Sequence, residues 1–206
     1  MKRALPAVLI LVFATAAYAD LADDVIAAYG GAAAWQKVKS FRQSGTVASP
    51  MWPAPGNVTR TWTRPDKLTF EAVYPDKKET RVVDGAHGTM NGKEVSDNNV
   101  AAMRLQAARL ALPALLLDHR AEVKTVDAKT LEVPIAPMLS VIMEVDPKTH
   151  RVTRTVSKGP AFEFSTAYSD FRSVDGLLFA FSEDNYANTT KTATTTLTKI
   201  EINPAP

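Results

Sequence analysis

The pattern of apolar and polar positions changes period along the chain. Over residues 20–39 apolar residues recur every three or four positions until Gly30-Gly31, which predicts a helix followed by a short second helix carrying Trp35. From Ser40 onward, β-branched and aromatic residues alternate with polar ones, as in strands with one buried face. The helical period returns over 97–118. These patterns predict a mainly β protein with a few helices.

The alternating segments predict a series of antiparallel strands joined by short turns. Pro-rich or Gly-containing turns separate them, and Asn91-Gly92 is a strong β-hairpin signal. A meander of about 11–12 such strands curls, so we expect an incomplete antiparallel β-barrel. The predicted strands span 40–49, 56–64, 67–74, 78–84, 86–95, 121–126, 129–134, 138–146, 150–158, 161–172, 176–187 and 191–202.

Residues 97–118 predict a helix that is more apolar than a surface helix needs to be. Ser96 or Asp97 is a suitable N-cap, and Pro113, which has no backbone N–H, predicts a kink or split. We expect this helix to cover the concave face, because an incomplete barrel must shield its apolar interior. Its apolar stripe consists of Val100, Met103, Ala107, Leu110, Ala114 and Leu117, widened by Leu105, Leu112 and Leu116.

The space between this helix and the sheet has two interpretations. It is either a filled core or a cavity that holds an apolar ligand, and the sequence pattern is the same for both. In the second interpretation an acyl chain replaces contacts between helix and sheet. The residues then predicted to line the cavity are Trp62, Leu68, Phe70, Tyr74, Val100, Met103, Leu110, Leu117, Phe162, Phe164 and Phe179.

The N-terminal segment has the organisation of a cleaved export signal. Lys2 and Arg3 precede an apolar run, and Ala17-Tyr18-Ala19 is a small-x-small cleavage site. The run is shorter than the roughly 20 apolar residues that a bilayer span needs. We therefore expect cleavage after Ala19, a periplasmic location, and a single domain formed by residues 20–206.

Composition and motifs narrow the function classes. The chain has no cysteine, so it has no disulfide framework, thiolate metal site or lipid-attachment cysteine. Without the signal, 22 basic residues balance 22 acidic ones, which argues against a nucleic-acid partner. The sequence patterns of P-loops, zinc proteases, dinucleotide sites and serine-hydrolase elbows are missing. We expect no enzymatic activity, no metal and no cofactor.

Two segments of the mature chain match a known pattern. The opening runs from Val25 through Gly30-Gly31 and Trp35 to Lys37-Val38-Lys39-Ser40-Phe41-Arg42-Gln43-Ser44-Gly45. The ending comprises Tyr168-Ser169-Asp170-Phe171-Arg172, Val174-Asp175-Gly176, Phe179 and Ile200-Glu201-Ile202-Asn203-Pro204. Both resemble the LolA-like proteins of bacterial outer-membrane lipoprotein sorting.

The resemblance implies a particular fold and activity. LolA-like and LolB-like proteins have an incomplete antiparallel barrel, closed by helices over an apolar cavity that takes lipoprotein acyl chains. The expected partners are lipids or lipoprotein acyl chains and the lipoprotein-transfer proteins of the inner and outer membranes, and the expected state is a monomer. The match around Arg42 is too short to assign it the family's arginine role.

Two other function classes remain open from the sequence. One is a non-catalytic periplasmic sensor or scaffold, favoured by a filled interior beside a large exposed apolar patch. The other is an exported hydrolase with a dispersed site, favoured by strongly perturbed acidic or histidine groups in a pocket. Asp84 and His87 are the only local pairing that suggests such a site, while His119 and His150 lie near predicted turns.

Overall fold

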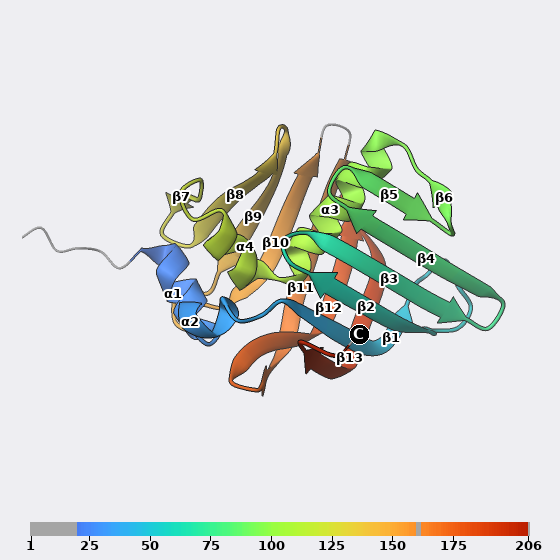
Figure 1. The fold of residues 1–206 in the computed structure, drawn as a ribbon, viewed down its shortest axis with the longest axis horizontal. Helices are drawn as coiled ribbons and strands as arrows, with labels where there is room; N and C mark the ends of the chain where they lie inside the picture. Colours follow the sequence, from blue (N-terminus) through green and yellow to red (C-terminus); the bar gives the residue numbers. More distant parts are fainter. Residues whose placement is uncertain (1–19, 160–161, 206) are drawn as a thin grey trace, which may run out of the picture.

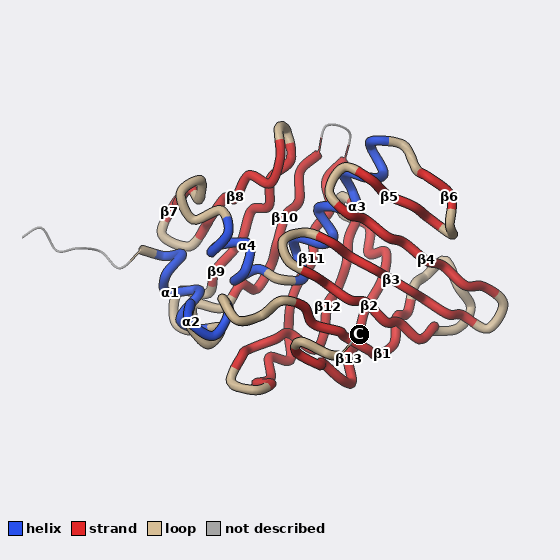
Figure 2. The backbone as a smooth tube through the Cα atoms, viewed as in Figure 1, coloured by secondary structure: helices blue, strands red, loops and turns tan. Residues whose placement is uncertain are grey.

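One curved antiparallel sheet dominates the computed structural model, which describes residues 20–159 and 162–205 (Figures 1 and 2). The predicted export signal, residues 1–19, lies outside the described residues. The strands are β1 (Ser40–Ala48), β2 (Gly56–Thr63), β3 (Lys67–Tyr74), β4 (Lys77–Asp84), β5 (His87–Met90), β6 (Lys93–Glu94), β7 (Lys124–Asp127), β8 (Thr130–Ala136), β9 (Leu139–Val145), β10 (Val152–Gly159), β11 (Phe162–Val174), β12 (Leu177–Ala187) and β13 (Thr190–Ile202).

The strand order confirms the predicted meander and adds one long-range pairing. The order is β6-β5-β4-β3-β2-β1-β13-β12-β11-β10-β9-β8-β7, so all neighbours are consecutive in sequence except β1 and β13. The sheet has two edges, β6 and β7, and is an incomplete barrel as expected. Thirteen strands form it because the predicted strand 86–95 is itself a hairpin, turning at Asn91 and Gly92 with φ of 52° and 74°.

Four helices accompany the sheet in the described part of the chain: α1 (Leu21–Ala28), α2 (Ala32–Trp35), α3 (Asp97–Leu110) and α4 (Leu112–Asp118). Asp20 caps α1, because its Oδ1 accepts a hydrogen bond from the Ala22 N–H at 2.9 Å. α3 and α4 together have the length and composition of a bilayer span, but they are bent by 102°, and no single described helix meets that criterion.

The bend between α3 and α4 confirms the predicted split of the 97–118 helix and places it at Ala111, two residues before Pro113. Pro113 lies in the first turn of α4, where a missing N–H costs no helical hydrogen bond. In a continuous helix the carbonyl of Arg109 would accept a hydrogen bond from the N–H of residue 113, which a proline cannot supply. The hydroxyl of Tyr168 donates to that carbonyl instead, at 3.3 Å.

α3 lies across the concave side of the sheet and connects its two halves (Figure 1). On one side it contacts β3, β4 and β5, and Gly88 of β5 leaves so little room that a Cβ there would lie 3.1 Å from Val100. On the other side it contacts β9 and β10, and Arg104 donates a hydrogen bond to the carbonyl of Ile135 on β8 at 3.3 Å. The helix is therefore held from both halves of the curled sheet.

Aromatic side chains pack α2 onto the concave face. Trp35 lies 5.5 Å from Phe179, and Phe41 lies 5.3 Å from Trp62 and 5.5 Å from Phe179, measured between ring centroids. All four side chains are buried, and the indole N–H of Trp35 donates to the carbonyl of Tyr29 at 2.9 Å. These four rings form the aromatic part of the core at this end of the interior.

Candidate functional site

A cleft of about 370 Å³ lies between α3 and the concave face. Its walls come from β1 to β5 on one side and from β11 to β13 on the other, with α3 between them. The volume falls within the range of about 300–1,000 Å³ that small-molecule sites occupy. The lining residues are Val47, Ser49, Met51, Trp52, Arg60, Phe70, Tyr74, Glu79, Arg81, Met90, Asn99, Ala102, Met103, Gln106, Arg109, Leu110, Phe164, Thr166, Tyr168, Glu183, Asn185, Tyr186, Thr192, Ala193 and Thr195.

The structure distributes the residues predicted to line a cavity over several places. The residues that line the cleft are Phe70, Tyr74, Met103, Leu110 and Phe164. Phe179 lines a pocket of about 30 Å³ that shares Arg109 and Tyr168 with the cleft, and Trp62 lines a groove of about 280 Å³ beside Ala108 of α3. Leu68 and Val100 are buried in the core, Leu117 packs against the core, and the side chain of Phe162 lies outside the described ones.

The face of α3 toward the cleft is more polar than the sequence pattern suggested. Asn99, Ala102, Gln106 and Arg109 recur every three or four positions and line the cleft together, as residues on one helix face must. Part of the apolar stripe that was expected to face the ligand belongs to the core instead. Val100 packs on Gly88, and Ala107 is wholly buried. The cleft is therefore amphipathic.

Aromatic and apolar side chains line the end of the cleft near the segment that follows β1. The rings of Trp52 and Tyr74 lie 5.5 Å apart, and the Nζ of Lys77 lies 4.2 Å from the Trp52 ring. Met51 lines the same cleft and is 73% exposed, so it marks the rim where the cleft meets solvent. This end offers apolar contact to a ligand that enters from outside.

A buried polar network, which was not predicted from the sequence, lies at the opposite end. The guanidinium of Arg60 donates to both carboxylate oxygens of Glu183, one at 2.8 Å, and to Oε1 of Gln43 at 2.5 Å. Arg60, Glu183 and Gln43 are only 4%, 6% and 2% exposed. The pairing satisfies both charges, as burial requires.

A signal for this network was present in the strand patterns. On β2 the inward positions are Gly56, Val58, Arg60 and Trp62, so an arginine occupies one position of a buried row. Glu183 likewise continues the inward row that Leu177, Phe179 and Phe181 form on β12. A charge at an inward position of an amphipathic strand indicates a buried partner.

The cleft contains a second arginine with partners. Arg81 forms an ion pair with Glu79, donates to Oε1 of Gln106 at 3.2 Å, and lies 5.0 Å from the Phe70 ring centroid. It therefore links β4 to α3.

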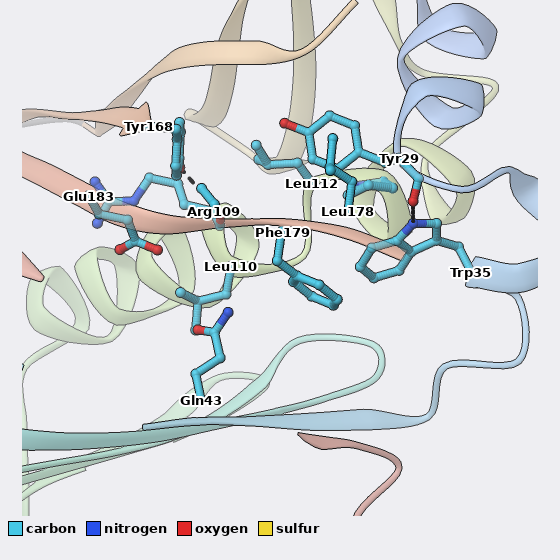
Figure 3. Close-up of a pocket in the computed structure, with 12 residues that line it drawn as sticks. Tyr29, Trp35, Gln43, Arg109, Leu110, Leu112, Tyr168, Leu178, Phe179 and Glu183 are labelled. Atoms are coloured by element: carbon cyan, nitrogen blue, oxygen red, sulfur yellow. Dashed lines mark hydrogen bonds between the residues drawn. The ribbon is translucent and has the colours of Figure 1, made fainter. Parts of the chain in front are cut away.

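Arg109 differs from the other two arginines of the cleft. Its side chain takes part in no ion pair and no side-chain hydrogen bond within residues 20–159 and 162–205. Burial lowers the pKa of Arg109, an effect that the nearby Tyr168 phenol and Glu183 carboxylate partly oppose. Figure 3 shows Arg109, Tyr168 and Glu183 grouped at one side of the small pocket.

Tyr168 positions the end of α3 beside this group. Burial, helped by the Glu183 carboxylate, raises the pKa of Tyr168 to about 12, so the phenol is neutral at ordinary pH. Its single proton is donated to the carbonyl of Arg109, and its oxygen accepts from Thr155 at 3.0 Å.

The described residues hold no group of three or more His, Asp or Glu side chains able to bind a metal ion. Asp84 and His87 face each other across the β4–β5 hairpin, but the carboxylate of Asp84 pairs with Lys67 at 2.8 Å and His87 is exposed. The three histidines do not lie in the cleft.

Comparison with solved structures identifies the fold as LolA-like. The crystal structure of a LolA superfamily protein from Nitrosomonas europaea superposes with a TM-score of 0.50 at 9% sequence identity, covering 83% of this chain and 88% of that one. A DUF1329 family protein from Desulfovibrio piger gives a TM-score of 0.49 at 9% identity, covering 89% and 92%. No family model and no curated protein matches the sequence. The predicted resemblance is thus confirmed at the level of the fold.

Proposed function

We propose that this protein is a periplasmic lipid-binding protein that carries the acyl chain of a lipoprotein or another lipid in the cleft beneath α3. The cleft itself is the observation that carries the proposal, because a filled core would leave no space for a ligand. The LolA-like fold and the predicted export signal support it. The open interior favours a carrier over the scaffold interpretation.

The energetics suit reversible binding. Each methylene removed from water contributes about 0.8 kcal/mol, so ten of them contribute about 8 kcal/mol before the cost of association. That cost offsets roughly half of the gain or more, which leaves an affinity that permits release. Trp52, Phe70 and Met103 supply the apolar contact surface.

Lipid extraction and a cleft-filling variant test the proposal. Protein isolated gently from a periplasmic fraction is extracted and its lipids are identified by mass spectrometry, and the delipidated protein is titrated with a fluorescent fatty acid. Ala102→Phe places a ring in the cleft and is expected to weaken fatty-acid binding about tenfold, a loss of about 1.4 kcal/mol. Ala33→Phe, at an exposed position of α2, is the matched control and leaves binding unchanged.

A negative result is equally clear. If no lipid co-purifies and the pure protein binds no fatty acid, the carrier function is wrong. If Ala102→Phe binds as the wild type does, the ligand lies outside this cleft.

Delivery adds a second requirement. A carrier exchanges its cargo with lipoprotein-transfer proteins of the inner and outer membranes, and we propose that this protein does so as a monomer. Transfer of a labelled lipoprotein between two vesicle populations, with and without the protein, measures that step.

A further inference from the structure

We infer that the cleft takes a single-chain amphiphile with an anionic head, a carboxylate or a phosphate, and that the guanidinium of Arg109 binds this head. The inference rests on the proposed function, because the tail of the amphiphile would occupy the same cleft. It adds the chemical class of the ligand and the orientation in which it is bound.

The charges of the cleft leave one guanidinium available. Among the described residues that line it, three are arginines and two are glutamates. Arg60 is paired with Glu183, and Arg81 is paired with Glu79. Within the described part of the chain, Arg109 therefore carries the one positive charge of the lining that has no opposite charge as an ion-pair partner.

The neighbouring carboxylate does not prevent an anion from binding there. Both oxygens of Glu183 accept hydrogen bonds from Arg60, so its charge is already compensated. The Tyr168 phenol donates to the backbone of Arg109 and does not occupy the guanidinium. No described side chain occupies the planar donors of Arg109, which match a carboxylate or phosphate in geometry.

The position of Arg109 also sets the orientation of the ligand. Arg109 lies where the cleft and the small inner pocket meet, since it lines both, together with Tyr168 and Glu183. The exposed rim with Met51 and the aromatic pair of Trp52 and Tyr74 belong to the cleft but not to the inner pocket. An amphiphile bound in this way has its head at the polar inner end and its tail toward the apolar rim.

A purely structural role for Arg109 is the competing explanation. An arginine in the last turn of α3 interacts favourably with the partial negative charge of the helix C-terminus. That role does not require the side chain to line a cleft, where a charge loses hydration and normally has a partner. Ligand binding separates the two explanations, because a helix-end charge has no preference for one head group over another.

The test compares ligands with the same tail and different heads. Dodecanoate, dodecyl phosphate, 1-dodecanol and inorganic phosphate are titrated by calorimetry into the mature chain in four forms: wild type, Arg109→Met, Arg109→Lys and Arg172→Met. Arg172 is exposed, pairs with Asp170 and does not line the cleft, so its variant is the matched control.

The wild type is expected to bind the two anionic amphiphiles at least about tenfold more tightly than dodecanol, the effect of one charge-assisted contact. Arg109→Met abolishes this preference while its affinity for dodecanol stays within about twofold of wild type. Arg172→Met keeps the preference. Arg109→Lys keeps part of it, and this variant decides the matter if the methionine variant does not fold.

The other outcomes overturn one claim or both. Equal affinity of the wild type for all three amphiphiles refutes the anionic head and leaves the carrier function standing. Binding of inorganic phosphate that depends on Arg109, with no amphiphile bound, identifies a free anion as the ligand and refutes the carrier function. If nothing binds, both claims fail.

Discussion

Neutralising Glu183 is the sharpest test of how the interior is stabilised. In Glu183→Gln the carboxylate becomes an amide of nearly the same shape, and one of its two acceptor oxygens is replaced by an NH₂ group that faces the Arg60 guanidinium. Arg60, which is 4% exposed in the wild type, loses its counter-charge and keeps its hydrogen bond to Gln43, 2.5 Å in the wild type. The variant therefore buries an uncompensated charge.

The magnitude follows from the contacts that are lost. Removing one partner of a buried ion pair costs about 3–5 kcal/mol, and a hydrogen bond to a charged group contributes about 1.5–3 kcal/mol. Because Arg60 lines the cleft, water can reach it in the variant, so we expect a loss near the lower end, about 3 kcal/mol. This corresponds to a drop in Tm of about 6–12 °C for a chain of this size.

Urea unfolding followed by tryptophan fluorescence measures the change in the free energy of unfolding. Glu94→Gln, at an exposed position of β6, is the control and stays within about 0.5 kcal/mol of wild type. Replacing both Arg60 and Glu183 with methionine removes the charges together, and we expect this double variant to be more stable than Glu183→Gln. A loss below about 1 kcal/mol in Glu183→Gln would refute the reasoning.

Three further predictions concern other parts of the molecule. The wild type loses stability as pH rises from 10 toward 12, because the unfolded chain releases the Tyr168 proton while the folded chain retains it. Tyr168→Phe should reduce the slope of the unfolding free energy against pH by up to about 1.4 kcal/mol per pH unit. Urea unfolding at several pH values measures this slope. Gly45→Ala places a Cβ 2.1 Å from the Thr196 carbonyl at the β1–β13 bulge and should cost about 1–3 kcal/mol in the same assay; a neutral result contradicts the close approach. Asn203→Ala removes the side-chain acceptor of the Lys39 and Ser40 N–H groups, at 2.7 and 3.1 Å, so hydrogen exchange at these two amides should accelerate, whereas unchanged exchange would show that the bonds are not protective.

Local features of the structure were predictable from the sequence. The strand predicted at 67–74 has the same bounds as β3, and the strand predicted at 176–187 differs from β12 by one residue. The split of the 97–118 helix was also predicted, from Pro113, although the break itself lies at Ala111. Alternation, proline chemistry and turn residues act between near neighbours in the chain, so a single sequence contains them.

Only the tertiary structure decided whether the interior is a core or a cavity. Apolar residues on α3 and on the strands have the same pattern in both cases, and the outcome depends on how far the curled sheet holds α3 from its concave face. Val100 and Met103, one turn apart on α3, both lie beside Gly88, yet only Met103 also lines the cleft. Which residues of α3 line the cleft and which lie only in the core therefore depends on the curvature of the whole sheet.

The sequence by itself determined the period of each segment, and with it the mainly β fold, the inward rows of the strands and the positions of the helices. It placed Arg60 and Glu183 on inward rows without showing that these residues, 123 positions apart, neutralise each other. Nor did it show that Arg109 has no such partner among the residues that the structure describes. The reason is physical: a period depends on neighbours along the chain, whereas the partner of a buried charge depends on which distant strands the curvature of the sheet brings together.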